Sequence, residues 1–200
     1  MRNSSENQIT LVLIRHGKTK SNAQHRYLGK TDEMLSKEGI QELLQNKKMQ
    51  CYPDVDIVFA SPMKRCVQTA QILYPYVPYA TVDEWTEMDF GDFEGKNYQE
   101  LQGDERYQEW IDSNGTLPFP HGESREDFIE RCEKGFWKMQ TQAMKAEKVG
   151  MIVHGGTIMA ILSRYGGGEY FDYRTDNGKG YVCTVKNFNK KPEITEIKKI

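Results

Sequence analysis

Three short apolar stretches of the sequence, at residues 10–14, 57–60 and 149–153, each lead directly into cationic or polar residues. Apolar runs of this length, bounded by Gly or Pro, are typical of strands that are buried on both faces. Segments with helical periodicity lie between the three runs. This alternation of strands and helices predicts an α/β fold, in which helices flank a mostly parallel central sheet.

Serine residues mark the expected starts of the main helices. Ser36, Ser61 and Ser124 suit the N-cap position, and Pro62 suits the first helical position. Ser124 and Asp127 together resemble a capping box. We expect these helices to end near residues 50, 73 and 146. We also expect a polar helix at 97–112, a short helix at 157–165, a short extended piece at 77–82, and a closing hairpin at 181–187 and 194–199. The chain 1–200 is then a single domain with a helical elaboration at about 95–147.

The composition excludes several classes of function. The chain has 200 residues and a net charge of −2, which does not indicate nucleic acid or an anionic membrane as a partner. No apolar run approaches the roughly 20 residues that span a bilayer. The polar N-terminus lacks the apolar core of a signal peptide, so we expect a cytoplasmic protein. The four cysteines show no CxxC pairing and indicate neither a metal site nor disulfides.

The residues that follow the three strands share one chemical character. They include Arg15, His16, Arg65 and His154. In open α/β sheets ligands bind at the carboxyl ends of the strands, so parallel neighbouring strands would bring these side chains into one crevice. A concentrated cationic crevice on a protein of negative net charge favours an anionic ligand.

The two arginines and two histidines narrow the chemistry further. The guanidinium fork matches a phosphate or a carboxylate, and an imidazole nitrogen can attack phosphorus near neutral pH. A single histidine at a strand end is more often a structural residue, and Arg65 alone would be an ordinary surface charge on a helix. The joint pattern favours a site for a phosphate.

At these residues the sequence resembles the histidine phosphatase superfamily, which has the phosphoglycerate-mutase-like fold. "LIRHGKTKSN" resembles the signature RHG-x-T-x-x-N, and "LGKTDEMLSKEG" resembles the segment that follows it. "FASPMKRCVQTA", "EMDFGDFEG", "PHGES" and "VHGG" resemble four further elements of the family, in the family's order. The resemblance covers roughly residues 9–187 and implies a three-layer α/β sandwich.

The resemblance also implies roles for single residues. His16 would attack phosphorus and become a phosphohistidine, while Arg15, Arg65 and His154 would hold the phosphoryl oxygens. Asn22 would donate a hydrogen bond to the phosphate. Substrate-binding residues in the same motifs would be Thr19, Ser21 and Gly155. The reaction would need neither a metal nor a cofactor.

Glu87 would be the general acid toward the leaving oxygen and then the base for the hydrolytic water. It stands among several other carboxylates, and by composition alone this segment could be a solvated acidic loop or a calcium loop. The spacing of the family motif selects Glu87, and we interpret Glu94 as structural. Leu28 departs from the family, in which a polar residue near the phosphate is frequent.

The sequence favours a phosphatase, because the paired arginines and long insertion of phosphoglycerate mutases are absent. The expected partner is a small phosphate ester. The compact length and the C-terminal "NGKGY" resemble α-ribazole-phosphate phosphatases, with broad-specificity sugar-phosphate and fructose-2,6-bisphosphatase-type enzymes as further alternatives. A phosphoglycerate mutase, or an inactive relative that binds a phosphorylated ligand, remains an alternative function. A sheet edge at the C-terminal hairpin could support a homodimer. The physiological substrate cannot be named from the sequence.

Overall fold

The protein is built around one six-stranded sheet with the strand order β3-β2-β4-β1-β5-β6. The computed structural model describes residues 8–188 and 190–200. The polar N-terminal stretch used to predict location lies largely outside them, at residues 1–7. β1 to β4 run parallel to one another, while β5 and β6 are antiparallel at one edge. The mostly parallel sheet predicted from the sequence is confirmed.

The bounds of the elements follow the predicted alternation. The strands are β1 (Ile9–Arg15), β2 (Ile57–Ala60), β3 (Tyr79–Thr81), β4 (Lys148–Val153), β5 (Gly180–Lys186) and β6 (Glu193–Lys199). The α-helices are α1 (Lys20–Ala23), α2 (Lys37–Lys48), α3 (Lys64–Leu73), α4 (Glu105–Asp112), α5 (Arg125–Gln142) and α6 (Gly155–Gly166). Short 3₁₀ turns lie at Asp83–Trp85, Gly91–Phe93 and Tyr170–Tyr173.

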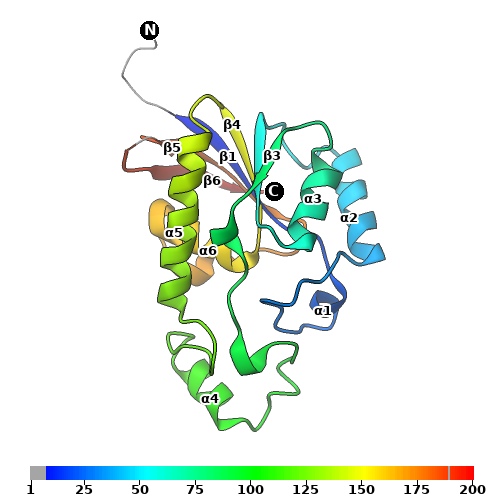
Figure 1. Cartoon of the computed structure of the whole chain (residues 1–200), viewed down its shortest axis with the longest axis vertical. Coiled ribbons are helices and arrows are strands. Elements are labelled where there is room, and N and C mark those ends of the chain that lie inside the picture. Colours follow the sequence, from blue (N-terminus) through cyan, green and yellow to red (C-terminus); the bar gives the residue numbers. More distant parts are fainter. Residues whose placement is uncertain (1–7, 189) are drawn as a thin grey trace.

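Helices cover both faces of the sheet. Figure 1 shows α2 and α3 on one face and α5 and α6 on the other. Residues of β1 alternate between the two sides, so that Leu11 and Leu13 join the core under α5 and α6, while Val12 and Ile14 join the core under α2 and α3. The predicted three-layer sandwich is confirmed, and the two-sided burial explains the uninterrupted apolar sequence of β1.

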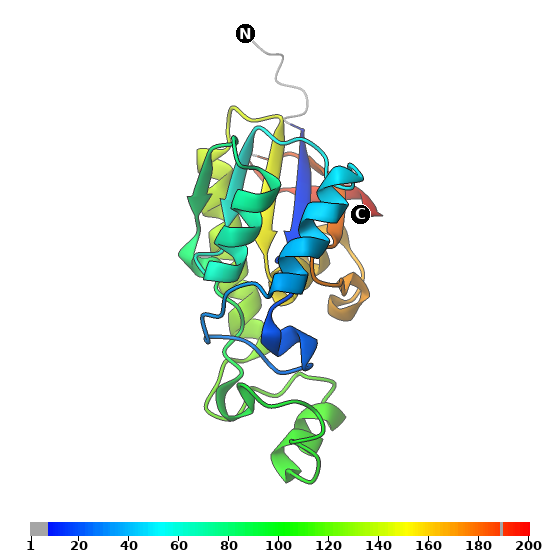
Figure 2. The same ribbon diagram turned by 90° about the vertical axis from the view of Figure 1, so that its right-hand side faces the viewer.

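The order of the strands brings the three apolar runs together. β4 lies between β1 and β2 and is parallel to both, with Arg15 paired to Val153 and Ala60 paired to Ile152. The three strands therefore end at the same edge of the sheet. In Figure 2 the arrowheads of β1 and β4 point to the end of the molecule where α1 and the segment carrying α4 lie.

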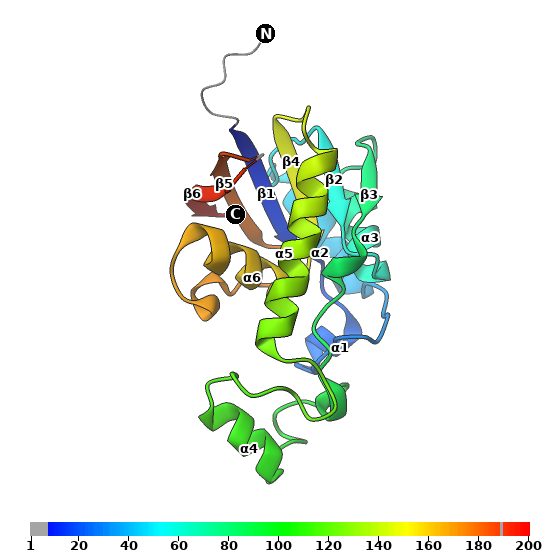
Figure 3. The same cartoon turned by 60° about the vertical axis from the view of Figure 1, so that its left-hand side comes forward.

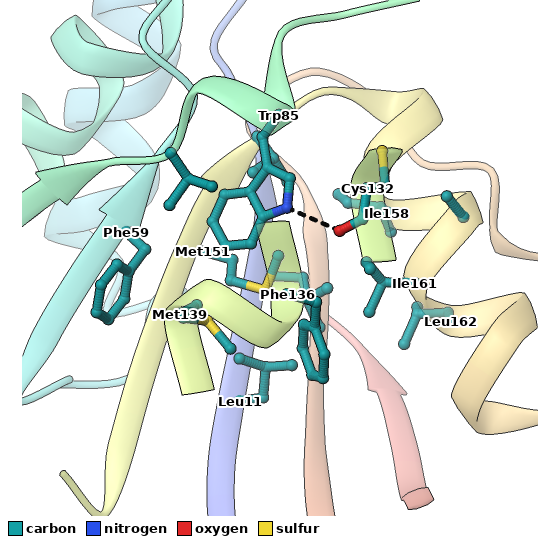
Figure 4. Packing of buried hydrophobic residues seen from close by; sticks show 14 of the residues in the cluster. Leu11, Phe59, Trp85, Cys132, Phe136, Met139, Met151, Ile158, Ile161 and Leu162 are labelled. Atoms are coloured by element: carbon teal, nitrogen blue, oxygen red, sulfur yellow. Dashed lines mark hydrogen bonds between the residues drawn. The ribbon is translucent and has the colours of Figure 1, made fainter. Parts of the chain in front are cut away.

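Trp85 anchors the segment after β3 in the core. Its side chain is fully buried, and its indole N–H donates a hydrogen bond of 3.2 Å to the carbonyl of Cys132 in α5 (Figure 4). Gly135 leaves the room for this ring, because a Cβ atom there would lie 2.5 Å from the indole nitrogen. The contact ties the segment that carries Glu87 to the long helix α5.

Some helix boundaries differ from the predictions. α3 begins at Lys64 and Met63 is its N-cap, whereas Ser61 was the predicted cap. The reason is that the Ser61 N–H still belongs to the sheet and donates to the carbonyl of Ile152, while its hydroxyl contacts His154. Residues 97–104 were expected to be helical but form turns, and helix begins only at Glu105.

The two helices of the region 95–147 lie in different parts of the molecule. α5 covers a face of the sheet, whereas α4 lies beyond the carboxyl ends of the strands (Figure 3). Within the described residues, β3 and β6 are the edge strands of the sheet, and the homodimer predicted for the C-terminal edge stays a prediction. No helix among the described residues is long and apolar enough to cross a membrane.

Candidate active site

His16 lies directly after β1 and is held by β4 and by the turn that follows it. Its backbone N–H donates to the carbonyl of Val153, and its imidazole Nδ1–H donates to the carbonyl of Gly17 at 2.8 Å. A carbonyl oxygen can only accept, so the proton of the neutral ring is on Nδ1. The lone pair of Nε2 is then available for another partner.

The turn after His16 is built around Gly17. Its N–H donates to the hydroxyl of Thr69 in α3 at 3.0 Å. A Cβ atom at Gly17 would lie 2.6 Å from a methyl carbon of Leu43. A larger residue would have to displace this methyl group, so glycine suits a turn that passes so close to α2. The turn fixes where the His16 ring stands relative to α3.

Arg65 enters the site from the first turn of α3 and is fully buried. Its guanidinium donates to the carbonyls of Thr31 at 2.9 Å and Gly29 at 3.0 Å, and more weakly to that of Leu28. The loop at 28–31 is thus fixed to Arg65 through backbone oxygens. A polar side chain at position 28 is not needed for this contact.

His154 follows β4 and is the N-cap residue of α6. Its ring is fully buried, and its Nε2 lies 2.8 Å from the hydroxyl oxygen of Ser61. The rings of His154 and His16 meet edge to face, with centroids 5.2 Å apart. The two strand-end histidines predicted to converge therefore do so.

Glu87 lies on the other side of His154, with its Oε2 atom 3.9 Å from Nδ1 of that ring. Its Oε1 atom accepts a hydrogen bond of 2.9 Å from the N–H of Met88. Arg131 of α5 holds the backbone of this segment by donating to the carbonyls of Glu84 and Thr86. The carboxyl of Glu87 is thereby directed toward the same edge of the sheet as the histidines.

Two guanidinium nitrogens in the described part of the chain are buried and have no hydrogen-bond partner. They are the Nε atoms of Arg15 and Arg65. Buried N–H groups are nearly always paired in folded proteins. Arg15 precedes His16 in the sequence, and Arg65 stands in the first turn of α3. We interpret the two unpaired N–H groups as donors for an anion that binds between them.

The environment changes the ionisation of the central residues. Burial lowers the pKa of both His16 and His154 well below the ordinary value of 6.5, and the charge of Arg65 lowers both further. Burial also raises the pKa of Glu87 above its ordinary value, although the N–H of Met88 and three nearby arginines oppose this effect. The site thus combines neutral imidazoles with a carboxyl group that holds its proton to higher pH.

The remaining predicted binding residues divide into two groups. Asn22 and Gly155 line clefts at Arg15. Thr19 is fully buried and its hydroxyl accepts from the N–H of Asn22, so in this structure it positions Asn22 at the start of α1. The N–H of Ser21 donates to the carboxylate of Glu33. Neither Thr19 nor Ser21 lines the two clefts.

Two clefts flank the Arg15 side chain. The first, of about 720 Å³, is lined by residues that include Asn22, Lys18 and Arg26. The second, of about 550 Å³, contains Glu87. Asp176 and Lys179 line both clefts and stand on the turn before β5.

Several supporting residues were not predicted. Arg131, Thr69 and Ser61 position Glu87, Gly17 and His154 as described above. The side-chain amide of Asn177 donates to Asn22 Oδ1 and to the carbonyl of His16, each at 3.1 Å. Ser61 and Thr69 lie inside the motif "FASPMKRCVQTA" and could have been found there. Arg131 lies in a polar stretch of helix, where nothing in the sequence distinguishes it from a surface charge.

Comparison with known proteins agrees with this geometry. Residues 11–198 match the family model of the histidine phosphatase superfamily (branch 1). The chain is 33% identical over 161 residues to the uncharacterized phosphatase PhoE of Bacillus subtilis, which covers 80% of this chain and 78% of that protein. It is 30% identical over 162 residues to the 2,3-bisphosphoglycerate-dependent phosphoglycerate mutase 2 of Gloeobacter violaceus, which covers 76% of this chain and 73% of the mutase.

The fold is shared with solved structures of the same kind. The crystal structure of the alpha-ribazole phosphatase from Shigella flexneri superimposes with a TM-score of 0.77 over 94% of this chain and 96% of that one, at 23% identity. At this identity the likeness establishes the fold alone. The family match and the identity to PhoE go further: the chain belongs to the histidine phosphatase superfamily, branch 1, and is a phosphatase within it.

Proposed function

We propose that the protein is a metal-independent phosphomonoesterase that hydrolyses a small phosphorylated metabolite through a phosphohistidine at His16. The observation that carries this proposal is the state of the His16 ring. It is buried, it is neutral because its pKa is lowered, and its Nδ1–H is engaged by Gly17, which leaves Nε2 as a nucleophile. The unpaired Nε atoms of Arg15 and Arg65 support an anionic phosphoryl group beside it.

The first step transfers the phosphoryl group to the enzyme. Nε2 of His16 forms a bond to phosphorus while the bond from phosphorus to the ester oxygen breaks. Glu87 gives its proton to the departing alkoxide, for which its raised pKa suits it. Arg15, Arg65 and His154 offset the charge on the phosphoryl oxygens by donating hydrogen bonds, which supplies the electrostatic part of catalysis.

The second step returns the enzyme to its starting state. Glu87, now a carboxylate, takes a proton from a water molecule whose oxygen attacks phosphorus. The bond between phosphorus and Nε2 breaks, and inorganic phosphate leaves. Glu87 is protonated again and His16 is again neutral, so the cycle balances without a further reactant.

Hydrolysis of p-nitrophenyl phosphate tests the proposal. We expect activity that persists after treatment with a chelator and that His16→Ala lowers by at least about 10³-fold, as is typical when a nucleophile is removed. His121→Ala is the matched control, because the His121 side chain is exposed and, among the described residues, its hydrogen-bond partner is Asp92. Full activity in His16→Ala would exclude the proposed mechanism.

Phosphoryl transfer between hydroxyl groups is the second candidate, supported by the 30% identity to a phosphoglycerate mutase. Incubation with 3-phosphoglycerate distinguishes the two reactions. Release of inorganic phosphate supports the phosphatase, whereas 2-phosphoglycerate as the main product supports the mutase. Binding of a phosphorylated ligand without turnover would instead support an inactive relative.

A further inference from the structure

The position of Glu87 decides which of the two clefts receives the leaving group. A general acid must reach the ester oxygen that it protonates. Glu87 lines only the second cleft, together with Arg15, Gly155 and Gly156. We call this cleft the leaving-group lobe. Its further lining residues are Phe90, Met159, Arg174, Thr175, Asp176, Lys179, Lys199 and Ile200.

The leaving-group lobe holds three basic side chains besides Arg15. Within the described residues, Arg174, Lys179 and Lys199 form no ion pair with a carboxylate. The Arg174 guanidinium lies 4.4 Å from the ring centre of Phe171, and the Lys199 ammonium lies 6.0 Å from that of Tyr181. Both contacts orient the cations without neutralising them.

The other cleft has the opposite character. Its Lys18 pairs with Glu42 at 2.9 Å, and its Arg26 makes a two-pronged contact with the carboxylate of Glu100. Apart from Arg15 and Lys179, which line both clefts, these cations are already paired with carboxylates of the protein itself. Arg174 and Lys199 line only the leaving-group lobe and add unpaired positive charge on the side where the leaving group must lie.

Acidic groups in the leaving-group lobe do not cancel this charge. Asp176 is its one acidic side chain besides Glu87 among the described residues, and Ile200, the last residue of the printed sequence, adds an α-carboxylate. Three basic side chains and Arg15 face these two groups. In the proposed mechanism Glu87 carries the proton that it gives to the ester oxygen, which agrees with the direction in which its pKa is shifted. The walls that Phe90 and Met159 contribute are apolar and suit a short carbon skeleton.

We propose that the leaving group of the substrate carries a second anionic group, a carboxylate or a phosphate, which Arg174, Lys179 and Lys199 bind in the leaving-group lobe. This inference rests on the proposed phosphatase function. It separates the protein from enzymes whose leaving group is neutral, such as a nucleoside. Arginine suits either anion through its fork, and the lysines add point charges.

Matched pairs of substrates test the inference. 3-Phosphoglycerate and glycerol 3-phosphate have the same carbon skeleton and differ by a carboxylate in place of a hydroxymethyl group. Fructose 1,6-bisphosphate and fructose 6-phosphate differ by a second phosphate. We expect kcat/KM to favour the doubly anionic member of at least one pair by about tenfold, which corresponds to the combined strength of a few partly exposed ion pairs. The favoured pair identifies the anion.

Variants assign the preference to the named residues. We expect Arg174→Gln combined with Lys199→Gln to reduce the ratio of kcat/KM within the favoured pair by at least about fivefold. Lys198→Gln is the matched control, because Lys198 is an exposed neighbour on β6 that does not line the leaving-group lobe. The substituted residues are exposed in both variants, and thermal unfolding checks that each variant folds.

The outcomes separate the inference from the proposed function. If the enzyme hydrolyses p-nitrophenyl phosphate through His16 but treats both members of each pair alike, only the inference is wrong. A preference that survives in the folded double variant also overturns it. If His16→Ala keeps its activity, the proposed function itself has failed. A preference that the double variant loses and Lys198→Gln keeps supports both.

Discussion

At the scale of single residues, burial keeps the His16 ring neutral at acidic pH values at which an exposed imidazole would be protonated. A buried imidazole between two arginines loses its proton readily, since both burial and like charge disfavour the cation. The same burial keeps the Nε2 lone pair of the neutral ring free of a proton at neutral and mildly acidic pH. The pKa of Glu87 is shifted in the opposite sense, so the proposed nucleophile is kept free of a proton while the proposed acid holds its proton to higher pH.

Glu87→Gln removes the proposed acid while nearly preserving the shape of the side chain. For an ester with a poor leaving group, we expect kcat/KM to fall by about 10² to 10⁴, the usual contribution of general acid catalysis. p-Nitrophenolate leaves without a proton, so its release in the first turnover should slow far less. Rapid-quench kinetics on the two substrates checks this difference, and an equal loss on both would contradict the role.

The pH dependence of kcat/KM also tests the role of Glu87 as the general acid. The first step needs Glu87 protonated, so kcat/KM should fall as the pH rises through the raised pKa of that group. The neutral form of His16 persists far down the acidic side, because its pKa is lowered. A profile of kcat/KM against pH for the ester with the poor leaving group should lose its basic limb in Glu87→Gln. A basic limb that is unchanged in the variant would assign it to another residue.

At the scale of elements, the site depends on three parallel strands that end together and on how closely the helices approach the turns that follow. Gly39 in the first turn of α2 is an example. A Cβ atom there would lie 2.1 Å from the carbonyl oxygen of Lys18, which is backbone and cannot turn aside. That carbonyl already accepts from the N–H of Ser36, so the entry to α2 and the turn after His16 are one unit.

Gly39→Ala should therefore destabilise the protein, although alanine favours helix by about 1 kcal/mol. Relieving the backbone overlap costs more, and we expect the free energy of unfolding to fall by a net ~1–3 kcal/mol. Urea denaturation measures the change. Gln41→Ala, at an exposed position of the same helix, should stay within about 0.5 kcal/mol of the wild type. Equal stability of the two variants would contradict this account of Gly39.

The sequence predicted the functional residues that directly follow a strand. It did not predict the residues that position them through tertiary contacts. Periodicity and motif order predicted the sheet, and the strand-end histidines do meet. Arg131 could not be predicted, because only the packing of α5 brings it to the backbone of residues 84 and 86. The start of α3 was placed too early, because the bonds of Ser61 to the sheet and to His154 are tertiary.

At the scale of the whole molecule, the buried neutral histidines link stability to pH. The pKa of His16 is lowered in the folded state, while in the unfolded chain it lies near 6.5. Below about pH 6.5 the unfolded chain therefore binds protons that the folded chain does not. The contribution of His16 to the free energy of unfolding is then present above this pH and is lost as the pH falls, by up to about 1.4 kcal/mol per pH unit.

His16→Gln isolates this contribution. We expect the free energy of unfolding to decline less steeply between pH 7 and pH 5 in the variant than in the wild type. The raised pKa of Glu87 acts in the opposite direction, but Glu87 is present in both proteins and its effect cancels in the comparison to first order. Urea denaturation at several pH values measures the two slopes. Identical slopes would mean that His16 is not neutral in the folded protein.

The phosphoenzyme itself can be trapped. Enzyme mixed with p-nitrophenyl phosphate, quenched in alkali within one turnover and digested for mass spectrometry, should carry an acid-labile phosphoryl group on the peptide that contains His16. Glu87→Gln should accumulate it, because the second step lacks its base, and His16→Ala should lack it. Turnover without any phosphoenzyme, or a phosphoryl group on a different residue, would contradict catalysis through His16.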